Sequence, residues 1–109
     1  MIMNMDKSPE EVTSEDELPD EIKVLTNDES KMEILNYLDY AKKEKTITEI
    51  SKKTGLDRGI AYYHLKRLEK GNLIKFIKPA TERRKLYVSI TNLGKSLVKY
   101  AKLEKKGEK

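Results

Sequence analysis

Basic and aromatic side chains recur between residues 57 and 70 at a spacing that puts them on one side of a helix. At 100° per residue, Ala61, Leu65 and Leu68 fall within about 60° of one another and form an apolar stripe. Opposite or beside this stripe lie Arg58, Gly59, Tyr62, Tyr63, Lys66, Arg67 and Lys70. Arginine can hold guanine through two hydrogen bonds, lysine suits phosphate or guanine, and glycine lets a backbone approach closely. The pattern predicts a helix whose exposed side binds nucleic acid.

A second basic group lies between two apolar segments further along the chain. Residues 73–78 and 85–90 have the apolar content and, in the second segment, the alternation of strands, and Pro79 ends the first of them. The polar residues 80–84 between them predict a turn, so residues 73–90 are expected to form a hairpin. We expect Arg83, Arg84 and Lys85 at its tip to contact phosphate or the minor groove, the alternative being a solvated turn.

Helix-capping residues set the elements that position these side chains. Asp57 can cap the helix over 57–70, and Gly71 can end it in a left-handed conformation. Before it, Thr48 is expected to cap a short helix that ends at Thr54, with Gly55 in the left-handed conformation that follows a helix. Two short helices joined by this turn, followed by a hairpin, predict a helix-turn-helix with a wing.

Three further helices are expected around this unit. Pro19 suits the first turn of a short helix, and Thr26 and Glu29 have capping-box spacing for a helix that runs to about residue 43. Thr91 can cap a last helix that ends near residue 106. Their apolar stripes are Leu35, Leu38 and Ala41 in the second of these helices, and Leu93, Leu97, Val98 and Ala101 in the last.

The charge of the chain changes sign along its length. Residues 1–30 hold 10 acidic and 2 basic residues, a balance of −8, whereas residues 31–109 hold 9 acidic and 21 basic residues, a balance of +12. We interpret residues 1–18 as an acidic, disordered arm, residues 19–106 as one domain and residues 107–109 as a tail. The arm either screens the basic domain from nonspecific nucleic acid or serves as a solubilising tail. The basic domain favours nucleic acid as a partner, although Lys-rich solvated faces are also common.

Several classes of function are poorly supported by the composition. The chain has no Cys and one His (His64), so we expect no thiolate or multi-histidine metal site and no cofactor. No nucleophile–base pair is evident, so an enzyme is not expected. The longest stretch without a charge is residues 86–94, much shorter than the roughly 20 residues of a membrane helix. The acidic N-terminus is unlike a signal peptide, and we expect a cytoplasmic, nucleoid-associated protein.

Three stretches in order resemble the winged helix-turn-helix regulators of the ArsR and MarR type, over about residues 19–106. Residues 22–38 look like the opening of the ArsR type, residues 47–56 like the bracing helix and turn, and residues 60–74 like the recognition helix and the entry to the wing. The resemblance implies a mainly α fold with a small β-hairpin (α+β). It also implies a recognition helix (57–70) in the major groove, a wing (73–90) on backbone or minor groove, and a homodimer formed by the first and last helices. Metal-sensing ArsR proteins use Cys or His clusters, which this chain lacks.

These observations together predict a sequence-specific regulator that binds double-stranded DNA, with no predicted metal and an unknown small-molecule effector. Two alternatives stay open: a winged-helix module that binds protein in a transcription or RNA-processing assembly, and a nonspecific architectural DNA-binding protein. Several residues of the recognition helix also have second interpretations. Tyr62 and Tyr63 could be core or dimer aromatics, and Ile60 is expected to pack on the bracing helix rather than touch a thymine methyl. His64 is expected to be half-buried and hydrogen-bonded rather than a pH switch or a ligand.

Overall fold

The computed structural model describes residues 18–82 and 84–107, with side chains up to Glu104, and shows five helices and a small antiparallel sheet. In chain order the elements are α2 (Asp20–Lys23), η3 (Val24–Asn27), α3 (Glu29–Ala41), β1 (Lys45–Thr46), α4 (Ile47–Thr54), α5 (Arg58–Lys70), β2 (Ile74–Ile77), β3 (Tyr87–Ile90) and α6 (Asn92–Gly107). The predicted mainly α fold with a hairpin is confirmed. The predicted acidic arm lies outside the described residues except for Leu18, which is buried in the core.

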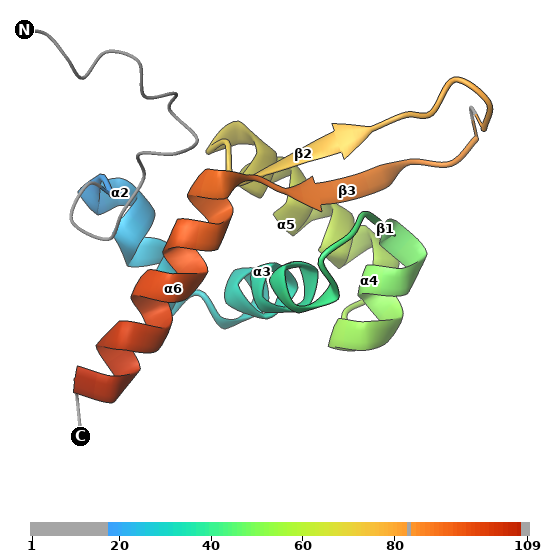
Figure 1. The fold of residues 1–109 in the computed structure, drawn as a ribbon. Coiled ribbons are helices and arrows are strands. Elements are labelled where there is room, and N and C mark those ends of the chain that lie inside the picture. The colour runs from blue at the N-terminus through green and yellow to red at the C-terminus, as the bar shows by residue number, and fades with distance from the viewer. Residues whose placement is uncertain (1–17, 83, 108–109) are drawn as a thin grey trace, which may run out of the picture.

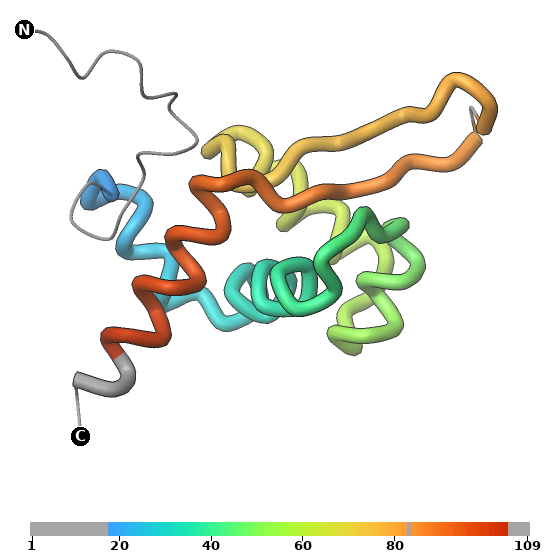
Figure 2. Tube along the Cα trace, viewed as in Figure 1, coloured from blue at the N-terminus to red at the C-terminus, as the bar shows by residue number. Residues whose placement is uncertain are grey.

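Helix α3 lies at the centre of the molecule and contacts α4, α5, α6 and β3 (Figures 1 and 2). Its residues Ile34, Leu35 and Leu38 have 1% or less of their surface exposed, so α3 presents a continuous apolar side to its neighbours. The other large, fully buried side chains are Ile50 of α4, Leu65 and Leu68 of α5, Leu73 just before β2, Ile74 of β2, Val88 of β3, and Leu97 and Val98 of α6. Helices α3, α4, α5 and α6 and both strands of the hairpin therefore contribute side chains to one core, and this shared packing fixes the orientation of α5 and of the wing.

The wing is the hairpin of β2 and β3, which projects beyond the helices (Figure 1). Ile74 pairs with Ile90 and Phe76 with Val88, so the apolar side chains alternate as predicted. The strands are shorter than predicted, four residues each. A third strand, β1, pairs with β3 through Lys45–Val88 and Thr46–Tyr87 and was not predicted. Because two residues have no recognisable period, only the pairing with β3 makes this segment a strand.

Several helix ends differ from the prediction. Asp28, rather than Thr26, caps α3 by accepting a hydrogen bond from the Lys31 amide at 3.1 Å, while the Thr26 hydroxyl donates to the Lys23 carbonyl. The capping box of α4 is formed by Thr46 and Glu49, so α4 begins at Ile47 and not after Thr48. In each case two cap residues of similar chemistry lie two positions apart, and the contacts of the rest of the chain select between them.

The end of α5 also differs from the prediction. Gly71 has φ −87°, and the left-handed residue is Asn72 with φ 65°. Asparagine tolerates this conformation through local hydrogen bonding of its side chain. Three predicted caps are confirmed: Gly55 is left-handed with φ 78°, Asp57 accepts from the Gly59 amide at 2.9 Å, and Thr91 accepts from the Gly94 amide at 3.0 Å.

Candidate nucleic-acid interface

The turn between α4 and α5 is held by side-chain hydrogen bonds to the backbone. The Ser51 hydroxyl donates to the Leu56 carbonyl, the Thr54 hydroxyl donates to the Ile50 carbonyl, and the Leu56 amide donates to the Thr54 hydroxyl. These bonds tie the last turn of α4 to Leu56 in the turn that follows. Sequence reasoning did not single out Ser51 or Thr54, although small hydroxyl residues near a helix end are the usual signal. The turn therefore holds α5 at a defined angle to α4.

Helix α5 buries one side and exposes the other, as the apolar stripe predicted. Ala61, Leu65 and Leu68 have 1% or less of their surface exposed. All predicted contact residues of α5 are exposed: Arg58, Gly59, Tyr62, Tyr63, Lys66, Arg67 and Lys70. The alternative that the two tyrosines are core aromatics is thus wrong, since Tyr62 is 43% and Tyr63 54% exposed. Ile60 is 49% exposed and lies outside the core cluster.

Cations lie over aromatic rings on this exposed side of α5. The guanidinium carbon of Arg67 is 5.5 Å from the ring centre of Tyr63. The Lys66 ammonium is 5.4 Å from the ring centre of Phe76, on β2, and 6.0 Å from that of Tyr62. Such pairs contribute about 0.5–1 kcal/mol at exposed sites. They pre-orient Arg67 and Lys66, and the guanidinium of Arg67 keeps its hydrogen-bond donors free to meet an anion or a base edge.

Phe76 joins the recognition helix to the wing, a contact that sequence reasoning missed. Its ring centre lies 6.1 Å from that of Tyr62.

Lys66 also forms an ion pair with Glu69, with 3.2 Å between Nζ and Oε1, on an exposed surface. An exposed pair of this kind contributes only about 0–1 kcal/mol, so an incoming phosphate can replace the carboxylate.

His64 links the recognition helix to α3. The Lys31 ammonium lies 3.0 Å from Nδ1 of His64 and 2.9 Å from the Asp28 carboxylate, and Lys31 itself is buried. Burial, followed by the charge of Lys31 and in smaller part that of Arg67, lowers the pKa of His64, while Asp28 opposes the shift. An ammonium donates to an unprotonated ring nitrogen, so the neutral histidine suits this arrangement. The predicted half-buried, hydrogen-bonded His64 is confirmed, and Lys31 is the partner that the sequence did not reveal.

This linkage predicts that acid weakens the fold through His64. Because the pKa of His64 is lower in the folded protein than its ordinary value, the unfolded chain takes up the proton first as the pH falls. The free energy of unfolding should therefore be at its full value above about pH 7 and decrease as the pH falls through the ordinary histidine range near 6.5. Urea unfolding between about pH 5.5 and 7.5 measures this.

His64→Asn provides the control for the acid effect, since the asparagine Oδ1 can accept at the position of Nδ1 and the amide does not titrate. His64 is the one histidine of the chain, so this variant should lose most of the pH dependence in that range. A variant that keeps the wild-type slope would contradict the assignment.

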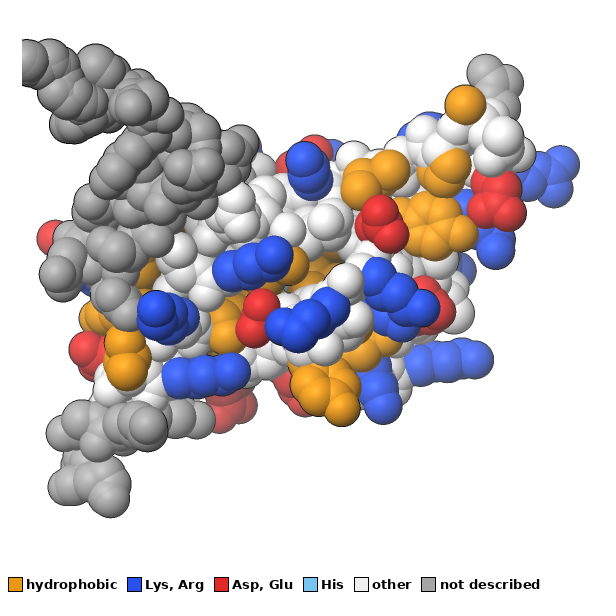
Figure 3. Space-filling view, viewed as in Figure 1, with side chains coloured by type: hydrophobic (Ala, Val, Ile, Leu, Met, Phe, Trp, Pro, Cys, Tyr) orange, Lys and Arg blue, Asp and Glu red, His pale blue; other side chains and the backbone are white. Residues whose placement is uncertain are grey.

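Basic side chains of the wing lie close to the start of α5. Arg84 and Lys85 are exposed, and together with Arg58 they line one hollow beside the first residues of α4. Arg83 lies outside the described residues. Figure 3 shows Lys and Arg side chains at the outer end of the wing and below it, over α4, and further ones across the rest of this face. The structure thus brings Arg58 to the wing residues, while Tyr63 and Arg67 pair further along α5.

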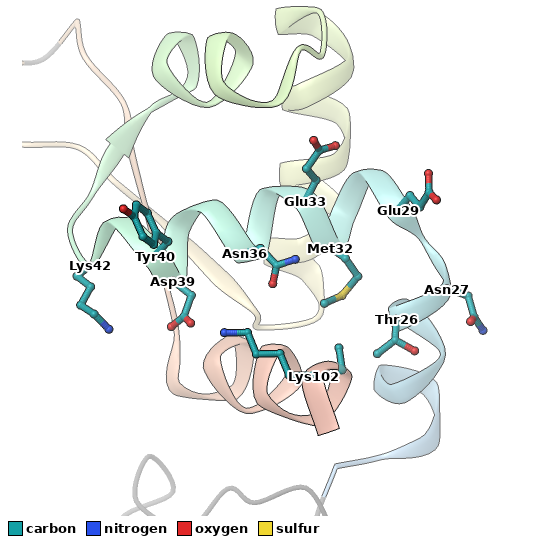
Figure 4. Close-up of a pocket in the computed structure, with 11 residues that line it drawn as sticks. Thr26, Asn27, Glu29, Met32, Glu33, Asn36, Asp39, Tyr40, Lys42 and Lys102 are labelled. Carbon is teal, nitrogen blue, oxygen red and sulfur yellow. The ribbon is translucent and has the colours of Figure 1, made fainter. Parts of the chain in front are cut away.

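A larger hollow lies on another face, between α3 and α6 (Figure 4). It has a volume of about 1080 Å³, and no residue of α5 or of the wing lines it. Three carboxylates, those of Glu29, Glu33 and Asp39, lie along it, together with two lysines, Lys42 and Lys102. Carboxylates repel phosphate, so this face is a poor site for nucleic acid.

Two other kinds of site find no support within the described residues. They contain no group of three or more His, Cys, Asp or Glu that could hold a metal ion. Across the same residues, no helix is both long and apolar enough to cross a lipid bilayer.

The helix-turn-helix part of the chain matches a known family. Residues 28–75, from α3 to the start of β2, match the model described as bacterial regulatory protein, arsR family. Among curated proteins, none matches the sequence. The match confirms the predicted resemblance over the elements that carry the recognition helix.

Solved structures of MarR-family regulators share the fold. The YusO protein from Bacillus subtilis aligns with a TM-score of 0.69 at 17% identity, over 81% of this chain and 65% of that protein. A point mutant of S. aureus MepR, bound to an oligodeoxyribonucleotide, aligns with a TM-score of 0.67 at 21% identity, over 82% of this chain and 71% of that protein. BpsR from Bordetella bronchiseptica, whose DNA binding is regulated by 6-hydroxynicotinic acid, aligns with a TM-score of 0.58 at 21% identity.

The alignment with BpsR covers 64% of this chain and 52% of that protein, so the chain spans between half and three quarters of the three proteins. The identities are low, and the likeness is one of fold. The chain therefore has the winged helix-turn-helix fold, and its helix-turn-helix part matches a model of bacterial regulatory proteins.

Proposed function

We propose that this protein is a sequence-specific regulator that binds double-stranded DNA with α5 in the major groove and the wing on the backbone or in the minor groove. The observation that carries the proposal is the exposed side of α5, where cations lie over aromatic rings and face away from a well-packed core. A helix fits the major groove, and the preceding helix braces it on the backbone. The matched family and structures are transcription regulators, so the proposed activity is binding in the cytoplasm, at the chromosome, and not catalysis.

Base reading is assigned to the middle and end of α5. Arg67 offers the planar fork that holds guanine O6 and N7, and Tyr63 lies beneath it with more than half of its surface exposed. Lys66 and Lys70 are expected to contact phosphates on either side of the groove, where a cation supplies affinity without base preference. Gly59 lets the start of α5 approach the backbone closely.

In vitro selection from random duplex DNA at about 150 mM salt, near physiological ionic strength, tests the proposal. Enrichment of a motif with two related half-sites about one helical turn apart is the expected result. Binding without enrichment, with a steep dependence on salt, would instead indicate an architectural protein. Absence of duplex binding would favour a protein-binding module.

The regulator is proposed to act as a homodimer through its first and last helical segments. Val24 of η3 is 58% exposed and Leu103 of α6 is 47% exposed, and α2, which leads into η3, contacts α6. Large apolar side chains exposed on adjoining elements are typical of an interface. A symmetric dimer would present two copies of α5 to two half-sites.

Leu103→Glu is expected to convert the dimer to a monomer, because it places a charge where the apolar surfaces meet. Sedimentation equilibrium measures the mass. Ile60→Glu is the matched control, since Ile60 is 49% exposed on α5, away from the proposed interface, and should leave the dimer intact. A wild-type protein that sediments as a monomer on its own and on DNA would contradict the dimer.

A further inference from the structure

A hollow with a volume of about 460 Å³ lies where three separate parts of the chain meet. It is lined by Thr46, Ile47 and Thr48 at the start of α4, by Arg58 at the start of α5, and by Arg84, Lys85 and Leu86 of the wing. The volume is within the range of small-ligand sites, about 300–1,000 Å³. The sequence separates these residues by up to 40 positions, so only the fold assembles them.

The charge in this hollow is not compensated within the described part of the chain. Arg58, Arg84 and Lys85 form no ion pair with any carboxylate described there. Arg58 is the first residue of α5, where the helix dipole is positive and a cation is disfavoured. A bound anion would relieve both the repulsion among the three cations and the unfavourable position of Arg58.

Helix α4 adds a neutral donor. The Glu49 carboxylate accepts hydrogen bonds from the Thr46 amide at 2.9 Å and the Thr46 hydroxyl at 3.2 Å, so neither group is free to bind a ligand. The Thr46 amide, helped by nearby lysines, lowers the pKa of Glu49, which stays ionised at neutral pH and does not line the hollow. Thr48 is exposed, and its hydroxyl makes no hydrogen bond within residues 18–82 and 84–104. It can therefore donate to an oxygen held by the cations.

We propose that this hollow binds one phosphate group, through Arg58, Arg84, Lys85 and the Thr48 hydroxyl. The inference deepens the proposed function, on which it rests for its main source of phosphate, the phosphodiester of bound DNA; free phosphate is a second source of the same chemistry. A phosphate held by α4, α5 and the wing together fixes the angle of the wing on the duplex. Arg58 then contacts the DNA backbone, whereas the sequence alone placed it among the residues that contact the groove.

The test on DNA compares Arg58→Ala, Arg84→Ala and the double variant with wild type by fluorescence anisotropy on a duplex over a series of salt concentrations. Each single variant should bind about tenfold more weakly at physiological salt, and its salt slope should shrink by about 0.9, because one phosphate contact is lost. The double variant should be within about threefold of the singles, because residues that share a partner have non-additive effects. Lys95→Ala, an exposed lysine of α6, is the control for a general loss of charge.

Two results on DNA would overturn the inference. The first is a loss in the double variant equal to the product of the single losses, about 100-fold, as independent sites require. The second is a loss of preference at one base pair in Arg58→Ala, since a phosphate contact weakens binding about equally on all sequences. Both arginines are exposed, so the variants should fold, which their thermal unfolding midpoints will verify.

Titration with inorganic phosphate, at constant ionic strength against chloride, separates this inference from the proposed function. Phosphate should shift the NMR signals of the Thr48 amide and the Arg58 guanidinium in the wild type but not in Arg84→Ala. Such shifts in a protein that binds no duplex would support the site and refute the proposed function. A non-additive loss on DNA without these shifts would assign the site to the phosphodiester alone. If phosphate causes no shift and the loss on DNA is additive, the inference is overturned.

Discussion

Arg67→Ala is expected to weaken binding to the selected DNA site by about 1–3 kcal/mol, or roughly 5- to 150-fold, and to relax the base preference at one position of each half-site. The guanidinium is exposed, lies over the Tyr63 ring and forms no ion pair among the described residues, so its donors are free for a base edge. Anisotropy on a set of duplexes, each with one substituted base pair, measures both effects.

Arg67→Lys is the matched control because it keeps the charge and loses the planar fork. Its binding to nonspecific duplex should stay within a factor of about 3 of the wild type, whereas its preference at the same base pair should disappear. If Arg67→Ala instead weakens binding equally on every duplex, Arg67 contacts phosphate, and base reading must be assigned elsewhere on α5.

Gly94→Ala is expected to lower the free energy of unfolding by at least about 2 kcal/mol, in the range measured for overpacked interiors. A Cβ atom at this position would lie 2.7 Å from Cγ1 of Ile90 and closer still to the Leu73 carbonyl oxygen. The carbonyl oxygen also accepts the Thr91 amide at 3.0 Å, so it is held and cannot move aside. Thermal unfolding should show a midpoint lower by about 10 °C.

Gly59→Ala serves as the comparison for the effect of adding a methyl group to a helix. The nearest atom to a Cβ there is Oδ2 of Asp57 at 3.2 Å, the oxygen that caps α5, and a shift of a few tenths of an ångström in this side chain relieves the contact while the cap is kept. Alanine favours a helix over glycine by about 1 kcal/mol, so this variant should be as stable as wild type or more so. A Gly94→Ala protein with an unchanged midpoint would show that α6 can shift away from the strands at no cost.

The close approach at Gly94 places α6 against the base of the wing. Leu73, whose carbonyl oxygen would meet the added Cβ, is itself fully buried, and Ile90 is the last residue of β3. Loss of this contact should therefore loosen the base of the wing as well as the core. DNA affinity of Gly94→Ala, measured below its unfolding midpoint, is expected to fall even though Gly94 is buried and is not a predicted contact residue.

Local features of the sequence, its apolar periodicity and its capping residues, were sufficient to predict most of the helices and strands. The stripe of Ala61, Leu65 and Leu68 set the buried side of α5, and its opposite side proved exposed as predicted. Gly55 and Asp57 set the turn between the two helices, because a left-handed residue and an N-cap act within a few positions of the chain. Once the buried side of α5 was predicted, the basic and aromatic residues on its opposite side were identified as exposed.

Choices between neighbouring residues depended on the tertiary structure. Thr46 rather than Thr48 caps α4 because its segment pairs with β3, about 40 positions away. Asn72 rather than Gly71 takes the left-handed conformation, since the chain must then turn so that Leu73 enters the core. Both candidates were visible in the sequence in each case, and local propensity did not distinguish them.

The sequence by itself determined the order of the main helices and the hairpin, the buried side of each and the basic, aromatic character of the exposed side of α5. Only the tertiary structure decided that Lys31 is buried against His64, 33 positions away, and that Arg58 shares a hollow with Arg84 and Lys85. The reason is physical: periodicity and capping act over a few residues, whereas these contacts arise when distant segments pack on one core. The groups that orient the recognition helix and the wing belong to this second kind.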